Sequence, residues 1–323
     1  MPFLAVLVFT ATLAASPPPA IASPAPAIAS PAPAIATPAP AAATPGPNNA
    51  AQPEFILADA EFKAGNNTAA INDFSQAIQL DPSFLGSYLD RGNAELRLGQ
   101  LEDAIVDFSH VVKADPNNAI AYSNRGATYG QLGQNALALA DLRRASVLSP
   151  KDAKTEYNLA SAEGQSGDLK DALADMNKCV AIEPAVYSYR GRAVIESALG
   201  DQKAAVKDIT TAIKLGVASP TLLADRAMFY QRSRLYPAAL ADYAAAIKLA
   251  PTVPQYRLLR AQTDLLAKNL TGAIADLRAA RKQLSDAGES NAVANIDHAI
   301  KILEARAHAK PTPAAAPKPT PHR

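Results

Sequence analysis

The chain has 323 residues, with 31 basic and 30 acidic side chains and a net charge of +1. Such a balance argues against a surface that attracts nucleic acid or an anionic membrane through charge. Apolar residues make up 49% of the chain and aromatic residues only 6%, with no tryptophan, which predicts helices that pack closely through small side chains. A single cysteine, Cys179, excludes a disulfide within the chain.

The first segment, residues 1–20, is typical of a cleaved signal peptide. A short apolar run at residues 3–13 precedes Ala14, Ala15 and Ser16, and it is shorter than the roughly 20 residues that a membrane-spanning helix needs. We therefore expect a periplasmic or secreted protein with no membrane span in its mature form. Because no Lys or Arg precedes the run, an uncleaved anchor or a cytosolic location remains the alternative.

Proline-rich segments are expected at both ends of the chain. Residues 21–50 contain little except Pro, Ala and Ile, with Ser or Thr at every seventh position, and residues 309–323 form a basic, Pro-rich tail. Proline removes backbone donors and fixes φ, so both segments are predicted to be disordered or extended and not to pack. The N-terminal one would act as a spacer or, alternatively, as a ligand for a proline-binding domain.

An Ala-x-x-Asp pattern recurs along the rest of the chain. Its aspartates are Asp73, Asp107, Asp141, Asp175, Asp208, Asp242 and Asp276, separated by 34 residues at every step except one of 33. So strict a period predicts a repeat solenoid, one continuous body that grows by stacking. The short step falls in the fifth repeat, between Pro184 and Ala193.

Each repeat reads as two short amphipathic helices joined at a glycine. Five repeats carry Gly eight residues before the aspartate, as expected where the chain turns through the left-handed region. Arg234 and Lys268 take this position in the last two repeats, at a cost of about 1–2 kcal/mol each if they adopt that conformation. A large apolar residue follows each aspartate, a small one such as Cys179 comes three residues later, and proline ends most repeats, with Val217 and Ser285 as exceptions.

This pattern resembles the tetratricopeptide repeat. The resemblance implies an all-α, right-handed superhelical solenoid of helix-turn-helix repeats. Residues 288–308 are predicted to form a C-terminal capping helix, because a solenoid must cover its last apolar face. The seven repeats are expected within residues 51–287, at 51–84, 85–118, 119–152, 153–185, 186–219, 220–253 and 254–287.

The resemblance also implies a concave groove lined by the first helix of each repeat. Some family members grip a C-terminal carboxylate there, and Asn93, Asn124 and Lys154 match that clamp, whereas Leu89 and Asn158 stand where cations are expected. Because the clamp is incomplete, we expect the groove to bind a peptide or protein segment without requiring a C-terminal carboxylate. The alternative is that the protein binds its partner through the convex face or the edges. The predicted groove residues are Leu89, Asn93, Arg97, Asn124, Lys154, Tyr157, Asn158, Tyr187 and Arg190.

A second periodic set consists of arginines that precede the repeat aspartates by sixteen residues. Both kinds of residue flank positions that pack the helices, so a partly buried Arg–Asp bond between helices is favoured over an arginine ladder for acidic ligands. The sequence leaves open whether pairing is within or between repeats. Leu159 replaces the arginine in the fourth repeat, which predicts a more apolar junction there. The set is Arg91, Arg125, Arg192, Arg226 and Arg260 with Asp107, Asp141, Asp208, Asp242 and Asp276.

No pattern of catalysis or of metal or cofactor binding occurs in the sequence. The four histidines lie apart from one another and from Cys179, and no Gly-rich phosphate loop or nucleophile elbow is present. We therefore predict a non-catalytic scaffold or adaptor that binds a protein partner in its groove, without a cofactor. The alternatives are a structural spacer of the cell envelope that works as a homo-oligomer, or the regulatory arm of an enzyme encoded separately.

Overall fold

The computed structural model describes residues 48–308. The predicted signal segment, nearly all of the Pro-rich linker and the C-terminal tail lie outside this range. Over the described range the chain forms fifteen α-helices and no strand, and none of these helices has the length and apolar character to cross a membrane. The prediction of an all-α solenoid of helix-turn-helix repeats is confirmed.

The helices group into two compact units, with the division between Val217 and Ala218. This differs from the single continuous body that the repeat period predicts. The division falls where a repeat lacks its terminal proline: α11 ends before Gly216, and Val217 is 90% exposed.

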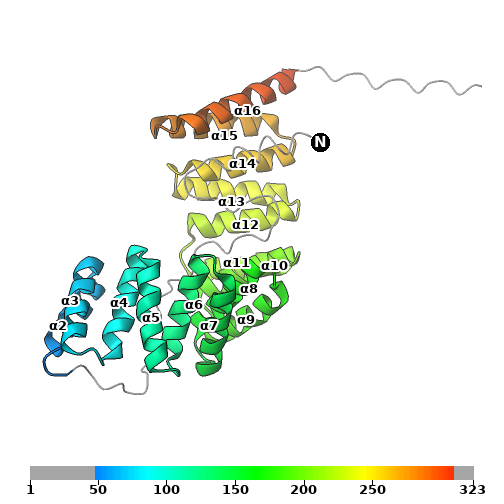
Figure 1. The fold of residues 1–323 in the computed structure, drawn as a ribbon. Coiled ribbons are helices and arrows are strands. Elements are labelled where there is room, and N and C mark those ends of the chain that lie inside the picture. The colour runs from blue at the N-terminus through cyan, green and yellow to red at the C-terminus, as the bar shows by residue number, and fades with distance from the viewer. Residues whose placement is uncertain (1–47, 309–323) are drawn as a thin grey trace, which may run out of the picture. The chain divides into compact units, whose positions relative to one another are not determined.

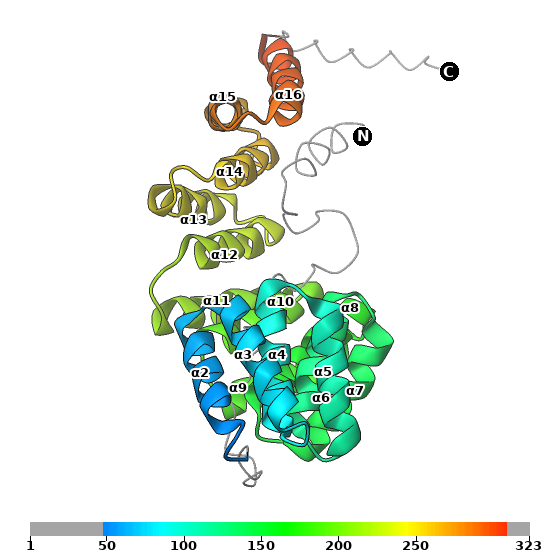
Figure 2. The same cartoon turned by 60° about the vertical axis from the view of Figure 1, so that its left-hand side comes forward.

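The first unit consists of five helix pairs, each pair packed against the next (Figures 1 and 2). Short turns join the members of each pair, so they run antiparallel. Their bounds are α2 Gln52–Ala64, α3 Asn67–Leu80, α4 Leu85–Leu98, α5 Leu101–Ala114, α6 Ala119–Gln131, α7 Asn135–Leu148, α8 Ala153–Ser166, α9 Leu169–Ile182, α10 Val186–Ala198 and α11 Gln202–Leu215.

The second unit contains two pairs and a final helix. Because Ser285 replaces the proline that ends other repeats, α15 continues for 17 residues. The last helix packs on it through Ile296, Ile300 and Leu303, as a capping helix should. The bounds are α12 Pro220–Arg232, α13 Tyr236–Leu249, α14 Pro254–Leu266, α15 Leu270–Asp286 and α16 Ser290–His308.

The turns within the pairs follow the glycine pattern. The five predicted glycines, Gly65 to Gly200 in sequence order, have φ between 71° and 92°. Arg234 and Lys268 have φ of 60° and 63°, so both meet the condition under which the sequence argument assigns them a conformational cost. Both residues lie in the second unit, which therefore contains two strained turns.

The core of every pair is built from the same three positions on the second helix. The alanine of the Ala-x-x-Asp pattern, the large apolar residue after the aspartate and the small residue three positions later are all buried, and Cys179 is one of the small ones. Alternation of large and small side chains lets adjacent helices interdigitate. At Gly92 the fit is so close that an added Cβ would lie 2.8 Å from Phe108 Cε1.

Candidate functional site

The predicted groove amides of α4 and α6 bond to each other. Asn124 Nδ2 donates to Asn93 Oδ1 at 2.7 Å, and the two residues are 1% and 3% exposed. Both side chains therefore lie buried against each other, and Asn124 Oδ1 has no hydrogen-bond partner within residues 48–308. Their contact instead joins the first helices of two successive repeats.

Several other predicted groove residues also connect neighbouring helices. Arg97 is exposed, but its Nη1 donates to the Phe62 carbonyl at 2.8 Å and its guanidinium lies 3.6 Å from the centre of the Phe62 ring. Leu89 packs in the apolar cluster around Val111. These side chains fix the spacing of successive first helices.

The predicted residues of α8 and α10 are half-buried or buried. Tyr157 is buried, and its ring meets that of Tyr187 edge to face at 5.5 Å between centroids. The Tyr187 hydroxyl donates to Glu183 Oε2 at 2.7 Å. Lys154 and Arg190 are half-buried. The structure thus brings the two tyrosines together as a packing pair.

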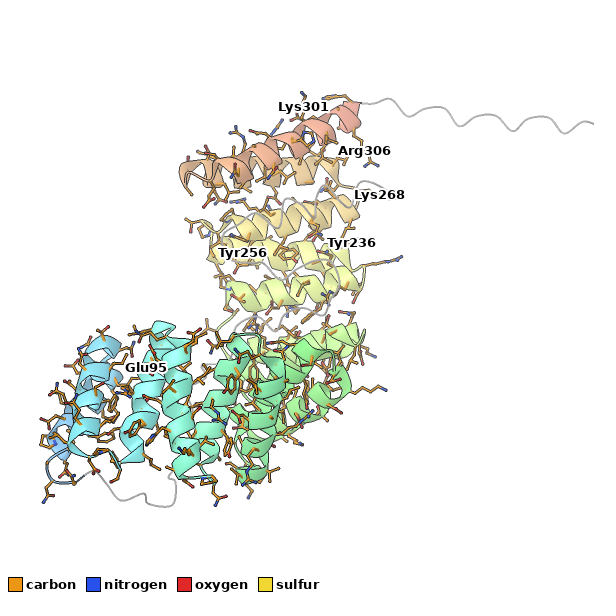
Figure 3. All side chains as sticks on the ribbon, in the orientation of Figure 1. Glu95, Tyr236, Tyr256, Lys268, Lys301 and Arg306 are labelled. Atoms are coloured by element: carbon orange, nitrogen blue, oxygen red, sulfur yellow. The ribbon has the colours of Figure 1, made fainter. Side chains whose placement is uncertain are left out.

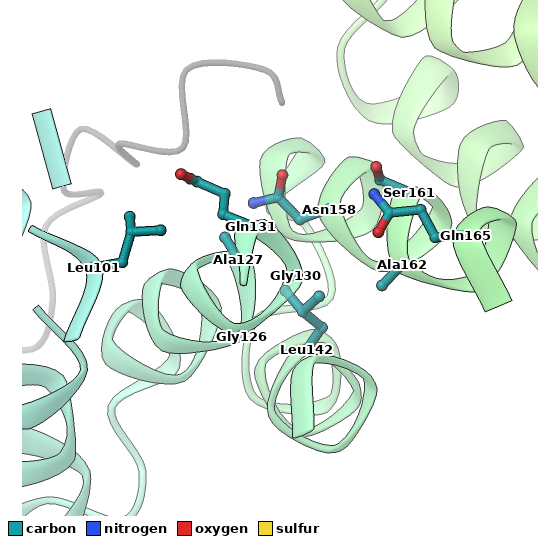
Figure 4. A pocket seen from close by; sticks show the side chains of 10 residues that line it. All are labelled: Leu101, Gly126, Ala127, Gly130, Gln131, Leu142, Asn158, Ser161, Ala162 and Gln165. Carbon is teal, nitrogen blue, oxygen red and sulfur yellow. The ribbon is translucent and has the colours of Figure 1, made fainter. Parts of the chain in front are cut away.

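A pocket of about 410 Å³ opens between α6 and α8 (Figure 4). Asn158 is the only predicted groove residue that lines it. The other polar side chains are Ser161 and Gln165, which lie on α8 like Asn158, and Gln131, which lies on α6. None of these four side chains bonds to another side chain within residues 48–308. The lining consists of Leu101, Gly126, Ala127, Gly130, Gln131, Leu142, Asn158, Ser161, Ala162 and Gln165.

Sequence reasoning missed the polar residues of this pocket other than Asn158. A signal was available, since Asn158, Ser161 and Gln165 recur at the i, i+3, i+7 spacing that puts residues on one face of a helix. Gln131 is the last residue of α6. A sequence-based assignment places such a residue in the turn, so it does not count among the groove-lining residues of the helix.

The periodic arginines are held by the aspartates sixteen residues later, within the same repeat. In all five pairs the arginine Nε donates to Oδ2 at 2.5–2.7 Å, and Nη2 donates to Oδ1 at 2.7–3.1 Å. Such bidentate pairs fix the geometry of the two helices that carry them. These arginines are therefore engaged in the helix pairs and do not form a ladder of free cations.

The same arginines also reach the preceding repeat. Arg91 Nη1 donates to Ser75 Oγ and Arg125 Nη1 to Ser109 Oγ, both at 3.0 Å, and Arg192 Nη1 donates to Asn177 Oδ1 at 3.0 Å. Each of these three guanidiniums thus ties three helices together. The question left open by the sequence is answered for them: the ion pair is within the repeat, and a neutral hydrogen bond links it to the repeat before.

In the fourth repeat a leucine replaces the arginine of this pattern, and an arginine appears on the preceding helix instead. Leu159 packs with Leu142 and Ala162, but the cation has moved to α7, where Arg143 stands at the position of Ser75 and Ser109 in other repeats. Arg143 Nη2 lies 3.3 Å from Oε1 of Glu163 on α8. Leu159 thus gives the junction an apolar contact, as predicted, while a cation stays close by in the form of Arg143.

The aspartate of this repeat takes a lysine partner in place of the absent arginine. Lys178 Nζ donates to Asp175 Oδ1 at 2.6 Å and lies 3.6 Å from Glu156 Oε2. Ser146 on α7 donates to the other oxygen of Glu156 at 2.5 Å. The fourth repeat therefore keeps an ionic network, built from different residues.

Three repeats place a glutamate beside the repeat aspartate, and it is buried at Glu95 and Glu163 and half-buried at Glu196. Glu95 lies on α4 (Figure 3), and burial, with the nearby charge of Asp107, raises its pKa to about 7. The pKa of Glu163 rises to about 7 through burial and Asp175, and that of Glu196 through burial and Asp208. The Oε2 atom of each is buried with no hydrogen-bond partner within residues 48–308. A carboxyl in such a site favours its neutral form.

No cluster of His, Cys, Asp or Glu suited to a metal ion occurs within residues 48–308. The only cysteine there, Cys179, is buried, and burial raises the pKa of its thiol to about 12.

Sequence profiles of one family match most of the repeats. Profiles described as "TPR repeat" match residues 58–98 and 92–133, and profiles described as "Tetratricopeptide repeat" match residues 153–186 and 224–288. The chain is a tetratricopeptide repeat protein. No curated protein sequence matches it significantly.

Two solved structures share this fold. A tetratricopeptide repeat protein from Parabacteroides merdae ATCC 43184 aligns with a TM-score of 0.61 and 17% identity, over 77% of this chain and 99% of that one. A chain of the APC/C hetero-tetramer Cut9-Hcn1 aligns with a TM-score of 0.60 and 15% identity, over 74% of this chain and 48% of its own length. At such identities the likeness extends to the fold alone.

Proposed function

We propose that this protein is a non-catalytic interaction scaffold that binds an uncharged, extended segment of a protein partner in the pocket between α6 and α8. The observation that carries the proposal is the set of side chains that surround the pocket, Gln131, Asn158, Ser161 and Gln165, which make no side-chain bonds elsewhere in the described part of the chain. Membership of a family of interaction repeats supports the general class.

Peptide recognition is the chemistry that these groups suit. A primary amide offers two N–H donors and a carbonyl acceptor, the groups that an extended backbone needs to replace its hydrogen bonds with water. Because the surrounding helices are fixed by ion pairs, only the ligand loses conformational freedom on binding.

A carboxylate-directed clamp has less support in the described residues. The two clamp amides that match the family's pattern, Asn93 and Asn124, are buried against each other, and the pocket has no charged side chain. A terminal carboxylate placed there would lose its hydration without a cation to replace it.

The test is partner capture with matched glutamine variants. Gln131→Ala combined with Gln165→Ala removes two exposed amides of the pocket, and Gln76→Ala with Gln79→Ala removes two exposed amides of α3. Proteins captured from an envelope extract by the unmodified chain and by the α3 variant, but lost with the pocket variant, support the proposal. Equal capture by all three contradicts it.

Export to the bacterial envelope is a separate part of the proposal. Its support is the apolar run at residues 3–13 followed by small residues. N-terminal sequencing of the chain purified from its native host should find a start close to Ser16. A chain that begins at Met1 and fractionates with the cytosol would contradict export.

A further inference from the structure

The pocket between α6 and α8 has a chemistry that restricts its occupant. Among its ten lining residues none is charged, and small ones, including Gly126, Ala127 and Ala162, form much of its wall. A charged occupant would be desolvated without compensation. Small side chains on the wall leave room for methyl groups and pyrrolidine rings, and the polar groups are mainly amide N–H donors and carbonyls.

We propose that the Pro/Ala-rich segment of this same chain, residues 17–47, binds in this pocket. The segment contains no charged residue and repeats Pro-Ala-Ile-Ala-Ser/Thr-Pro-Ala at residues 19–25, 26–32 and 33–39. Proline has no backbone N–H, so such a segment presents more acceptors than donors. The amide groups of Gln131, Asn158 and Gln165 supply the donors that its carbonyls lack.

The attachment point of the segment places the pocket within reach. Asn48, where the described chain begins, donates its N–H to Asp81 Oδ2 at 2.9 Å and its side-chain amide to the Leu80 carbonyl at 3.2 Å. It is thus fixed at the turn between α3 and α4. Packed helices lie about 8–10 Å apart, and α4 contacts α6 as α6 contacts α8, so α8 is about 20 Å along the stack from α4. An extended proline-rich chain covers about 60 Å in 20 residues.

A tethered ligand needs only weak affinity. A short flexible connection gives an effective concentration of about 1 mM, so a segment with a dissociation constant near that value already occupies the pocket about half of the time. Because three successive copies of the sequence can bind in turn, occupancy increases further. An external partner must then displace the segment, which would make the scaffold self-inhibited.

This inference uses the pocket of the proposed function but does not require any partner. It is tested on the full chain by fluorescence. The protein has no tryptophan, so Ser166→Trp, an exposed position on α8 next to the pocket, supplies the only one. Ser30→Cys carries a nitroxide quencher. Cys179 does not compete for the label, because it is buried and its thiol pKa is raised to about 12.

The expected result is a partial loss of tryptophan emission, of up to about half, upon labelling of residue 30. Emission should return when Ala127→Leu fills the pocket and stay low with Ala140→Leu, an equal change at an exposed position of α7. If Ala127→Leu does not fold, excess synthetic peptide of residues 24–37 added to the labelled parent chain should restore emission.

Three outcomes would overturn the inference. They are unquenched emission in the labelled chain, quenching that neither Ala127→Leu nor the peptide relieves, and quenching that arises only on mixing labelled chains with separate tryptophan-bearing chains, which would assign the contact to a second copy. Loss of partner capture by the glutamine variants is a separate result, so the two proposals can fail independently.

Discussion

Replacement of Glu95 by Gln should stabilise the first unit above neutral pH. Glu95 is 7% exposed, and burial and the charge of Asp107 raise its pKa from 4.5 to about 7. At 1.36 kcal/mol per pKa unit, this rise corresponds to about 3 kcal/mol. Because the folded-state pKa is the higher one, the stabilisation is present below pH 4.5 and is lost as the pH rises through 7. Glutamine resembles the neutral carboxyl and avoids that loss.

The assay is urea unfolding followed by helical circular dichroism at pH 5, 6, 7 and 8. The unmodified protein and Glu95→Gln should have similar midpoints at pH 5, and the variant should be the more stable by about 2–3 kcal/mol at pH 8. Glu102→Gln, an exposed site on α5, is the matched control and should follow the unmodified protein. If Glu95→Gln keeps the pH dependence of the unmodified protein, the argument that burial sets this pKa is refuted.

Three further predictions follow from the ion pairs and turns. Arg125→Leu should lower the free energy of unfolding by about 3 kcal/mol, because it leaves Asp141 buried and unpaired; added Asp141→Asn should restore part of it in chemical denaturation. Arg234→Gly should raise the stability of the second unit by about 0.5–1 kcal/mol, measured by thermal unfolding, since φ is 60° there. Leu159→Arg should lower the free energy of unfolding by less in a chain that also carries Arg143→Ser than in the unmodified chain. A double-mutant cycle should give a coupling energy above about 1 kcal/mol between the two changes. Additive effects on the free energy of unfolding would contradict the exchange of positions.

Much of the fold follows from the sequence because each repeat is a local unit. Turn glycines, core alanines and terminal prolines act within one helix pair, so their spacing predicts helix ends and buried faces without knowledge of distant contacts. The spacing of sixteen residues between Arg91 and Asp107 likewise spans one turn between two adjacent helices. Even the exceptions, Arg234 and Lys268, take the conformation that their position requires.

The contacts between repeats were harder to predict. Asn93 and Asn124 occupy inward-facing positions, and whether such amides face a ligand or each other depends on the distance between first helices. That distance is set by contacts such as Arg97 with Phe62, which pair residues 35 positions apart. The bonds from arginine to Ser75 and Ser109 were missed for the same reason. Nothing in a single repeat shows what the preceding one presents.

The exchanged charge of the fourth repeat lies beside the candidate pocket. Leu159 packs against Leu142 and Ala162, and both of these residues also line the pocket. An arginine at position 159, as other repeats have, would place a guanidinium next to these two lining residues. With the cation on α7 as Arg143, the junction keeps its link to Glu163 while the pocket keeps an uncharged lining. The one departure from the arginine pattern in the first unit's interior thus coincides with the place where a neutral surface is needed for an uncharged segment.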